Sequence, residues 1–544
     1  MAAVGALAVV VAGAGPLGCG ESGDGESPPE PGGEVRIAAS AVPDRIDPQL
    51  ASTPEARRAA RLTHVPLLTY RHAEGEEGAE VIAGLAEELP EVSENGIIYE
   101  LRLRTGMSYS DGTPIRASDF ERAIERLFDL RSPGASLYTA IAGAREYGAG
   151  EADSIAGIEA DDQSGRIAIE LTEPRGDFRN LLALPYAAPV PPGARDRGRR
   201  EGPPASGPYR ISGFERSERI ELERNPRFAS LLKGGAEIPV GYPDRITIRR
   251  NPDRSAQVRD LGRGRVDLVA GSPPASREEE IEARFPDRYR LENSIATYHF
   301  WMNTRMPPFN DLRVRQAVNY GIDRERLAQL LGGRLDPGQQ VLPQGVPGHE
   351  ELTLYPGPDL EAATELVAEA NPVDRRVTIW TDDDPGHLRA GAYYRGVLTR
   401  IGLGAELEVI PAEHYRGAIG DRRGADLDTG FWLHRPRYPH PNEYFGPLLS
   451  GRTIAPVASR NFAQADIPEL NAEIERLFDL GLEEAKGGYA ALDRMFMEQA
   501  VWAPWGQARV ATLVSPRIDL DRVVFHPVFG HDYSTMAQIE NGEK

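Results

Sequence analysis

Alternating apolar and polar residues predict several β-strands in this chain. Residues 97–103 (IIYELRL) alternate as a half-buried strand does. The same pattern predicts strands at residues 35–38, 209–214, 219–222, 377–381 and 405–410. The strands at 209–214 and 219–222 are predicted to form a hairpin whose turn is at residues 216–217.

Apolar residues spaced three and four positions apart predict helices between these strands. One helix begins at Ser118, which forms a capping box with Glu121, and its apolar face carries Phe120, Ile124, Leu127 and Phe128. Other helices are predicted at residues 313–321, 323–332, 467–480 and 489–501. Pro504 lacks the backbone N–H that would extend the last of them. Because strands and helices alternate, we predict an α/β protein of two or three packed lobes.

The composition narrows the classes of protein that fit this pattern. The chain has 544 residues, of which 40% are hydrophobic, so it can build sizeable cores and is not generally disordered. Its net charge of −21 repels phosphate backbones, and we therefore expect no nucleic-acid partner. Cys19 is the single cysteine, which excludes intrachain disulfides and multi-cysteine metal clusters.

Residues 1–33 resemble a bacterial lipoprotein signal followed by a flexible tether. Residues 1–18 are apolar or small and carry no charge, Cys19 follows directly, and residues 21–33 are rich in acidic residues, proline and glycine. In lipoproteins the cysteine is lipidated and becomes the mature N-terminus, so we expect an extracytoplasmic protein anchored to the cell membrane. An uncleaved anchor is the alternative, because about 18 apolar residues are just enough to span a bilayer.

Short motifs between about residue 34 and residue 540 follow one another in an order typical of one family. They include PDRIDP at 43–48, YSDGTPIRASDF at 109–120, GPY at 207–209 with ERNP at 223–226, and PFNDLRVRQA at 308–317. Together they resemble the extracytoplasmic solute-binding proteins of ABC importers, specifically the large peptide/nickel-type class, solute-binding protein family 5. Each motif by itself is a turn, a helix start or a strand end, so the motifs identify the fold rather than the ligand contacts.

This resemblance implies a two-lobe, periplasmic-binding-protein-like fold with an extra subdomain in the first lobe. The implied segments are residues 34–60, 186–275 and 505–544 for the first lobe, 61–185 for the inserted subdomain and 276–504 for the second lobe. Binding of a solute between the lobes would favour the closed form, which would deliver the solute to a membrane permease. We expect the protein to act as a monomer, without a cofactor and without catalysing a reaction.

The stretch DTGFWLHRPRYPHPNEYF at residues 428–445 holds the candidate binding site. In the family this region is a strand lining the cleft, followed by a motif like W-x-x-D-Y-x-D-P whose aspartate binds the α-ammonium of a peptide. Tyr438 aligns with the motif tyrosine, which places Arg437 where the aspartate belongs. Arg435 and His440 add potential positive charge, so we expect a peptide-like or anionic solute without a free ammonium at this end. The candidate ligand-binding residues are Gly430, Phe431, Trp432, His434, Arg437 and Tyr438.

Two alternative functions remain open. A nickel or metal-chelate receptor of the same family could use His434 or His440. An extracytoplasmic hydrolase could be built on this fold, although the chain has no Walker lysine motif, no HExxH and no GxSxG. A dinucleotide-like pattern of Gly13, Gly15 and Gly18 is followed by the tether instead of a helix, so we assign it no function.

Overall fold

The computed structural model describes every residue except 1–30, 195–201, 230–236, 422, 424–426 and 540–544. The predicted signal segment, Cys19 and the glycine pattern lie outside the described residues. Among the described helices, none combines the length and the apolar composition needed to cross a membrane.

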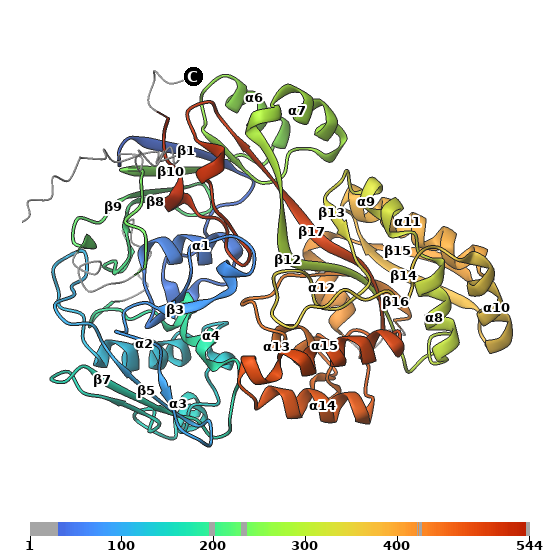
Figure 1. Ribbon diagram of the computed structural model, residues 1–544, viewed down its shortest axis with the longest axis horizontal. Helices are drawn as coiled ribbons and strands as arrows, with labels where there is room; N and C mark the ends of the chain where they lie inside the picture. Colours follow the sequence, from blue (N-terminus) through green and yellow to red (C-terminus); the bar gives the residue numbers. More distant parts are fainter. Residues whose placement is uncertain (1–30, 195–201, 230–236, 422, 424–426, 540–544) are drawn as a thin grey trace, which may run out of the picture.

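One large sheet runs through both halves of the molecule (Figure 1). Its two longest strands, β12 (Tyr289–Met302) and β17 (Trp502–Val514), pair antiparallel and cross from one half to the other. We call the half with the N-terminal strand the first lobe. It contributes β1 (Glu34–Ala39), β8 (Tyr209–Glu215), β9 (Arg219–Arg224), β10 (Arg245–Arg250) and β11 (Leu268–Ala270). The second lobe contributes β13 (Leu335–Pro337), β14 (Arg376–Asp382), β15 (Gly404–Ile410) and β16 (Thr429–His434).

A smaller antiparallel sheet of four strands forms a separate layer of the first lobe, with the order β4-β5-β7-β6. In β5 (Ile98–Arg102), Tyr99 and Leu101 are buried while Ile98 is exposed, which confirms the predicted half-buried strand. The other elements of this region are β2 (Leu68–Tyr70), β3 (Val81–Ala83), β4 (Glu91–Val92), β6 (Ile158–Ala160), β7 (Arg166–Glu170), α1 (Pro54–Thr63), α2 (Ser118–Asp129), α3 (Ala144–Ala149) and α4 (Phe178–Leu182).

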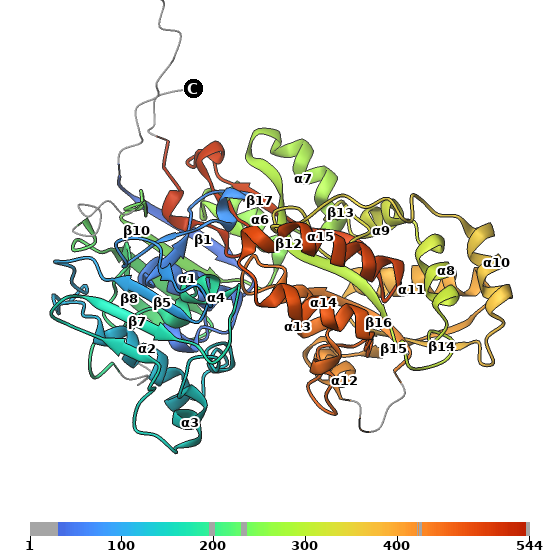
Figure 2. The same ribbon diagram turned by 60° about the horizontal axis from the view of Figure 1, so that its bottom comes forward.

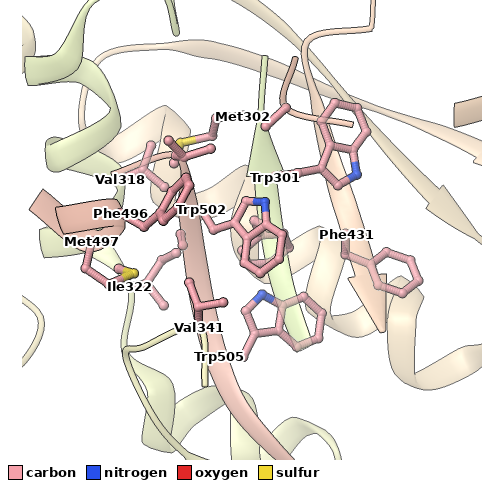
Figure 3. Packing of buried hydrophobic residues seen from close by; sticks show 14 of the residues in the cluster. Trp301, Met302, Val318, Ile322, Val341, Phe431, Phe496, Met497, Trp502 and Trp505 are labelled. Atoms are coloured by element: carbon pink, nitrogen blue, oxygen red, sulfur yellow. The ribbon is translucent and has the colours of Figure 1, made fainter. Parts of the chain in front are cut away.

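Helices surround the second lobe and its end of the crossing strands (Figure 2). They are α8 (Leu312–Gly321), α9 (Arg324–Leu330), α10 (Leu360–Ala370), α11 (Pro385–Arg400), α12 (Ala412–Gly420), α13 (Asn442–Leu449), α14 (Pro468–Phe478) and α15 (Leu482–Glu498). Near the crossing lie α6 (Arg254–Gly262), α7 (Glu278–Arg284), β18 (Phe525–His526) and β19 (Gly530–His531). The core of this lobe gathers around Trp301, Trp502 and Trp505 on the crossing strands, with Phe431 on the neighbouring strand (Figure 3).

The capping box predicted at Ser118 is wrong. Ala117 is the cap residue and Ser118 is already helical, so the Ser118 hydroxyl does not cap α2. The Ser118 backbone N–H and hydroxyl instead donate to the carboxylate of Asp162, at 2.9 and 3.0 Å. The acceptor comes from the turn between β6 and β7, which a pattern of local spacing does not reveal.

The last predicted helix begins earlier than its sequence pattern indicates. α15 starts at Leu482 and passes through Gly487 and Gly488, whereas the sequence predicted a start at residue 489. A Cβ at position 488 would lie 2.3 Å from the Leu477 side chain, so a glycine lets α15 approach α14 closely. The other predicted helices and the predicted strands are confirmed within a few residues at each end.

Candidate functional site

A cavity of about 1020 Å³ lies between the two lobes, beside the crossing strands. Its walls include residues 40–41, 54–55 and 57–58 of the first lobe and residues 384–387, 389, 433 and 435–436 of the second. The crossing strands contribute residues 294–296, 298 and 508–510. Since both lobes and both crossing strands form its walls, a change in the angle between the lobes alters its shape.

One side of the cavity rests on the aromatic core of the second lobe. Tyr298 on β12 lines the cavity and stacks on Trp505, with ring centroids 5.1 Å apart and planes 6° apart. The rings of His387 and Tyr298 meet edge to face, with their centroids 5.8 Å apart. Trp505 is fully buried, so Tyr298 is held against a packed core and presents a preformed flat surface.

Arginine dominates the charged residues that line the cavity. Its carboxylates are those of Glu55 and Asp384, and Asp384 also caps α11 by accepting a hydrogen bond from Gly386 N at 2.7 Å. Of the lining arginines, Arg334 is ion-paired with Glu278. The arginines that line the cavity are Arg57, Arg58, Arg254, Arg334, Arg389, Arg435 and Arg509.

The predicted site strand is β16, and its alternation decides which residues reach the cavity. Pairing with β12 sets Leu433 beside Tyr298, and Leu433, Arg435 and Pro436 line the cavity. Trp432 is paired with His299 on the opposite face, where its ring meets Phe462 at 5.1 Å. Gly430 belongs to that opposite face, and so does His434, whose side chain points away from the cavity.

The remaining predicted residues lie behind the cavity wall. Phe431 shares the cavity-side face but is buried, stacked on Tyr415 at 5.2 Å. At Gly430, a Cβ would lie 2.7 Å from the carbonyl oxygen of Trp380, so only glycine fits. None of the six predicted residues, all of them described, lines the cavity, and their role in binding stays a prediction.

The positive charge of Arg437 is balanced by the carboxylate of a neighbouring glutamate. Its Nε lies 3.1 Å from both carboxylate oxygens of Glu443, whose Oε2 also accepts the Arg437 backbone N–H at 2.9 Å. Burial lowers the pKa of Arg437, but the adjacent Glu443 outweighs it and holds that pKa above its ordinary value. The guanidinium therefore stays charged and committed to Glu443, which removes it as a free anchor for an anionic solute.

The two histidines of the loop carry no charge at neutral pH. Burial lowers the pKa of His434 well below its ordinary value and that of His440 to about 4. His440 Nδ1 accepts the backbone N–H of Asn442 at 3.2 Å. In the part of the chain that the structure describes, no group of three or more His, Cys, Asp or Glu side chains is arranged to hold a metal ion.

Tyr438 joins the two lobes. Its hydroxyl donates to Oδ2 of Asp177 in the first lobe at 2.7 Å, and both side chains are buried. Arg175 donates to the same carboxylate at 2.8 and 3.0 Å, and its guanidinium lies 5.2 Å from the ring of Phe478 in α14. Beside them, Gly176 N donates to Phe478 O at 2.9 Å. We call Arg175, Gly176, Asp177, Tyr438 and Phe478 the interlobe contact.

The predicted segment meets the cavity through Leu433, Arg435 and Pro436 alone, and most of the cavity wall comes from other parts of the chain. The motif alignment predicts Arg437 as the binding residue, whereas Arg435, two residues earlier, is the arginine of this loop that lines the cavity. Tyr298, Arg58 and Arg509 stand far from that segment and from one another in the sequence, and no local motif marks them. The pairing of β12 with β17 brings Tyr298 and Arg509 to one wall of the cavity, and α1 of the first lobe brings Arg58 to the same cavity.

Comparison with known proteins gives a family and several relatives. The model described as "Bacterial extracellular solute-binding proteins, family 5 Middle" matches residues 80–455. The periplasmic oligopeptide-binding protein OppA of Escherichia coli is 30% identical over 241 residues, which is 42% of this chain and 42% of OppA. The glutathione-binding protein GsiB of Escherichia coli is 26% identical over 327 residues, 59% of this chain and 60% of GsiB. The matched part of the chain thus spans less than two thirds of these relatives.

Solved structures match over nearly the full length. The clavulanic acid biosynthesis oligopeptide binding protein 2 has a TM-score of 0.84 at 26% identity, covering 94% of this chain and 96% of that one. The unliganded open form of the murein tripeptide binding protein MppA has a TM-score of 0.76 at 21% identity, covering 93% and 97%. These matches confirm the predicted two-lobe α/β fold.

Proposed function

Because the chain belongs to family 5 of the bacterial extracellular solute-binding proteins, we propose that it captures a peptide-sized organic solute for an ABC importer. Membership of a solute-binding family confirms the prediction of a binding protein instead of an enzyme. The relatives named for oligopeptides and glutathione support a solute of that size.

The observation that carries this proposal is the cavity between the lobes. Its volume of about 1020 Å³ is at the upper end of the range usual for small-molecule sites. Both lobes contribute walls, so a solute held there contacts both only when they are close together. Binding then stabilises the closed arrangement, which a permease can distinguish from the empty protein.

We place the protein outside the cytoplasm on a lipid anchor. The support for the anchor is the apolar segment, Cys19 and the tether in residues 1–33. Two acyl chains on one cysteine are enough for stable membrane attachment. Anchoring would keep a monomeric receptor near the permease that receives its solute.

Small-angle X-ray scattering tests the proposed capture and closure. The protein should have a smaller radius of gyration with a bound solute, identified by mass spectrometry of material that co-purifies with the undenatured protein. Leu433→Trp places a large ring in the cavity wall and should abolish both binding and compaction. Val409→Trp, on an exposed position of β15, is the matched control and should preserve both. Solute binding to Leu433→Trp at wild-type affinity would refute this site.

A further inference from the structure

The charges of the cavity identify a class of solute. We infer that the cavity binds an acidic, peptide-like solute with two or more carboxylates. This inference rests on the proposed function, because it assigns chemistry to the cavity in which capture is proposed.

Cationic side chains without an acidic partner are the first support. Arg254, Arg435 and Arg509 line the cavity, and in the described part of the chain none of them forms an ion pair or a side-chain hydrogen bond. The Nε of Arg509 is buried and has no hydrogen-bond partner in the described part of the chain. Guanidinium groups present a fork of donors that matches a carboxylate, so these three side chains are available for ligand anions.

Other arginines of the cavity are held by neutral groups. Arg58 donates to Phe529 O at 2.7 Å and to the Tyr533 hydroxyl at 2.9 Å, and Arg389 donates to Leu330 O at 3.1 Å. These bonds fix the side chains in place and leave their positive charges uncompensated. The arrangement is notable in a chain with a net charge of −21, where acidic side chains are in excess elsewhere.

The arginines are distributed over both lobes. Arg57, Arg58 and Arg254 belong to the first lobe, Arg389 and Arg435 to the second, and Arg509 to a crossing strand. Like charges on facing walls repel as the lobes approach. A solute with several negative groups removes this repulsion and contacts both walls, so binding of an acidic solute is coupled to closure.

Tyr298 on the crossing strand β12 and Arg435, which follows the neighbouring strand β16, both line the cavity and can donate hydrogen bonds to one acceptor. Burial holds the pKa of Tyr298 above its ordinary value, so the hydroxyl keeps its proton at neutral pH. A neutral phenol and a guanidinium both donate hydrogen bonds, which suits a carboxylate oxygen. Of the two lining carboxylates, Asp384 is used in capping α11, which leaves Glu55 against seven lining arginines.

Isothermal titration calorimetry with tetrapeptides of equal length and different charge tests the inference. The probes are Ala-Glu-Glu-Ala, Ala-Gln-Gln-Ala and Ala-Lys-Lys-Ala, with inorganic phosphate as a separate anion. We expect the acidic peptide to bind at least about 100-fold more tightly than the basic one, since hydrogen bonds to charged groups are individually worth about 10- to 100-fold. Arg435→Gln should weaken the acidic peptide by about tenfold or more and the glutamine peptide by less than about twofold.

Arg395→Gln is the matched control, because Arg395 is an exposed arginine of α11 outside the cavity and the substitution removes the same charge. Equal weakening by Arg395→Gln and Arg435→Gln would overturn the inference, because only the net charge would then matter. Tight binding of phosphate alone would overturn the carboxylate assignment. If the neutral or the basic peptide bound at least as tightly as the acidic peptide and closed the lobes, the inference would be overturned and the proposed function would stand. If no peptide bound and none compacted the protein, the result would count against the inferred acidic solute and against the proposed capture of a peptide-sized solute.

Discussion

Tyr438→Phe tests whether the interlobe contact favours the closed arrangement. The substitution removes one hydroxyl, which donates to the Asp177 carboxylate at 2.7 Å, and leaves the ring in its buried place. Burial alone would raise the pKa of Asp177, but Arg175 beside it outweighs burial and lowers that pKa to about 2. The acceptor is therefore an ionised carboxylate. Because the Asp177 side chain is not exposed to solvent, no water molecule can replace the hydrogen bond that the substitution removes.

The size of the effect follows from the charge of the acceptor. A hydrogen bond to a charged group contributes about 1.5–3 kcal/mol. At about 1.4 kcal/mol for each factor of ten, the closed arrangement loses about 10- to 100-fold in population relative to the open one. The hydrogen bond from Gly176 to Phe478 and the packing of Arg175 on the Phe478 ring remain, so the contact is weakened and not abolished.

Solute affinity and the radius of gyration are the quantities to measure. Tyr438→Phe should weaken solute binding by about tenfold or more, because only the closed fraction binds tightly. The control is Tyr394→Phe, which removes a buried hydroxyl 3.2 Å from Thr429 Oγ1 within the second lobe. This control should lower stability without changing affinity. Unchanged affinity and unchanged radius of gyration in Tyr438→Phe would show that the contact is the same in both arrangements and would refute the reasoning.

Three further predictions concern stability and attachment. Burial raises the pKa of Asp493 to about 7, so the stability from this group is complete below its ordinary pKa of about 3.9 and is lost as the pH rises through about 7. Denaturant unfolding should show the wild-type protein losing stability relative to Asp493→Asn across that range, and parallel pH profiles would contradict the assignment. Gly430→Ala places a Cβ 2.7 Å from Trp380 O and should lower the free energy of unfolding by about 1–3 kcal/mol. An unchanged free energy of unfolding would mean that the backbone of the sheet shifts to make room for the methyl group. Cys19→Ala should release the protein from membranes, whereas membrane-bound wild-type protein that retains residues 1–18 would contradict lipidation.

Periodicity and motif order were sufficient to predict the fold class. The alternation at residues 97–103 and the apolar spacing after Ser118 depend on neighbours in the sequence, and both elements form as predicted. The cap of α2 was missed because its acceptor, Asp162, lies 44 residues from Ser118 in the chain. Local patterns therefore found the elements, while contacts between distant segments decided how they end.

The same limit applies to the binding site. The motif alignment selected Arg437, but it could not show that Glu443, six residues later, lies against that guanidinium. The strand pattern could not decide which face of β16 meets the cavity, because both faces carry large apolar side chains. Pairing with β12 decides it by placing Leu433 next to Tyr298. The excess of arginine in the cavity is likewise a property of the assembled lobes.

A crystal structure of the protein with its co-purifying solute tests most directly the claim that capture occurs between the lobes. We predict density for the solute in the cavity, in contact with Tyr298 on the crossing strand β12, with Arg435 on the second lobe and with Arg58 on the first. A solute bound outside this cavity, or in contact with one lobe only while the lobes stay apart, would contradict the account.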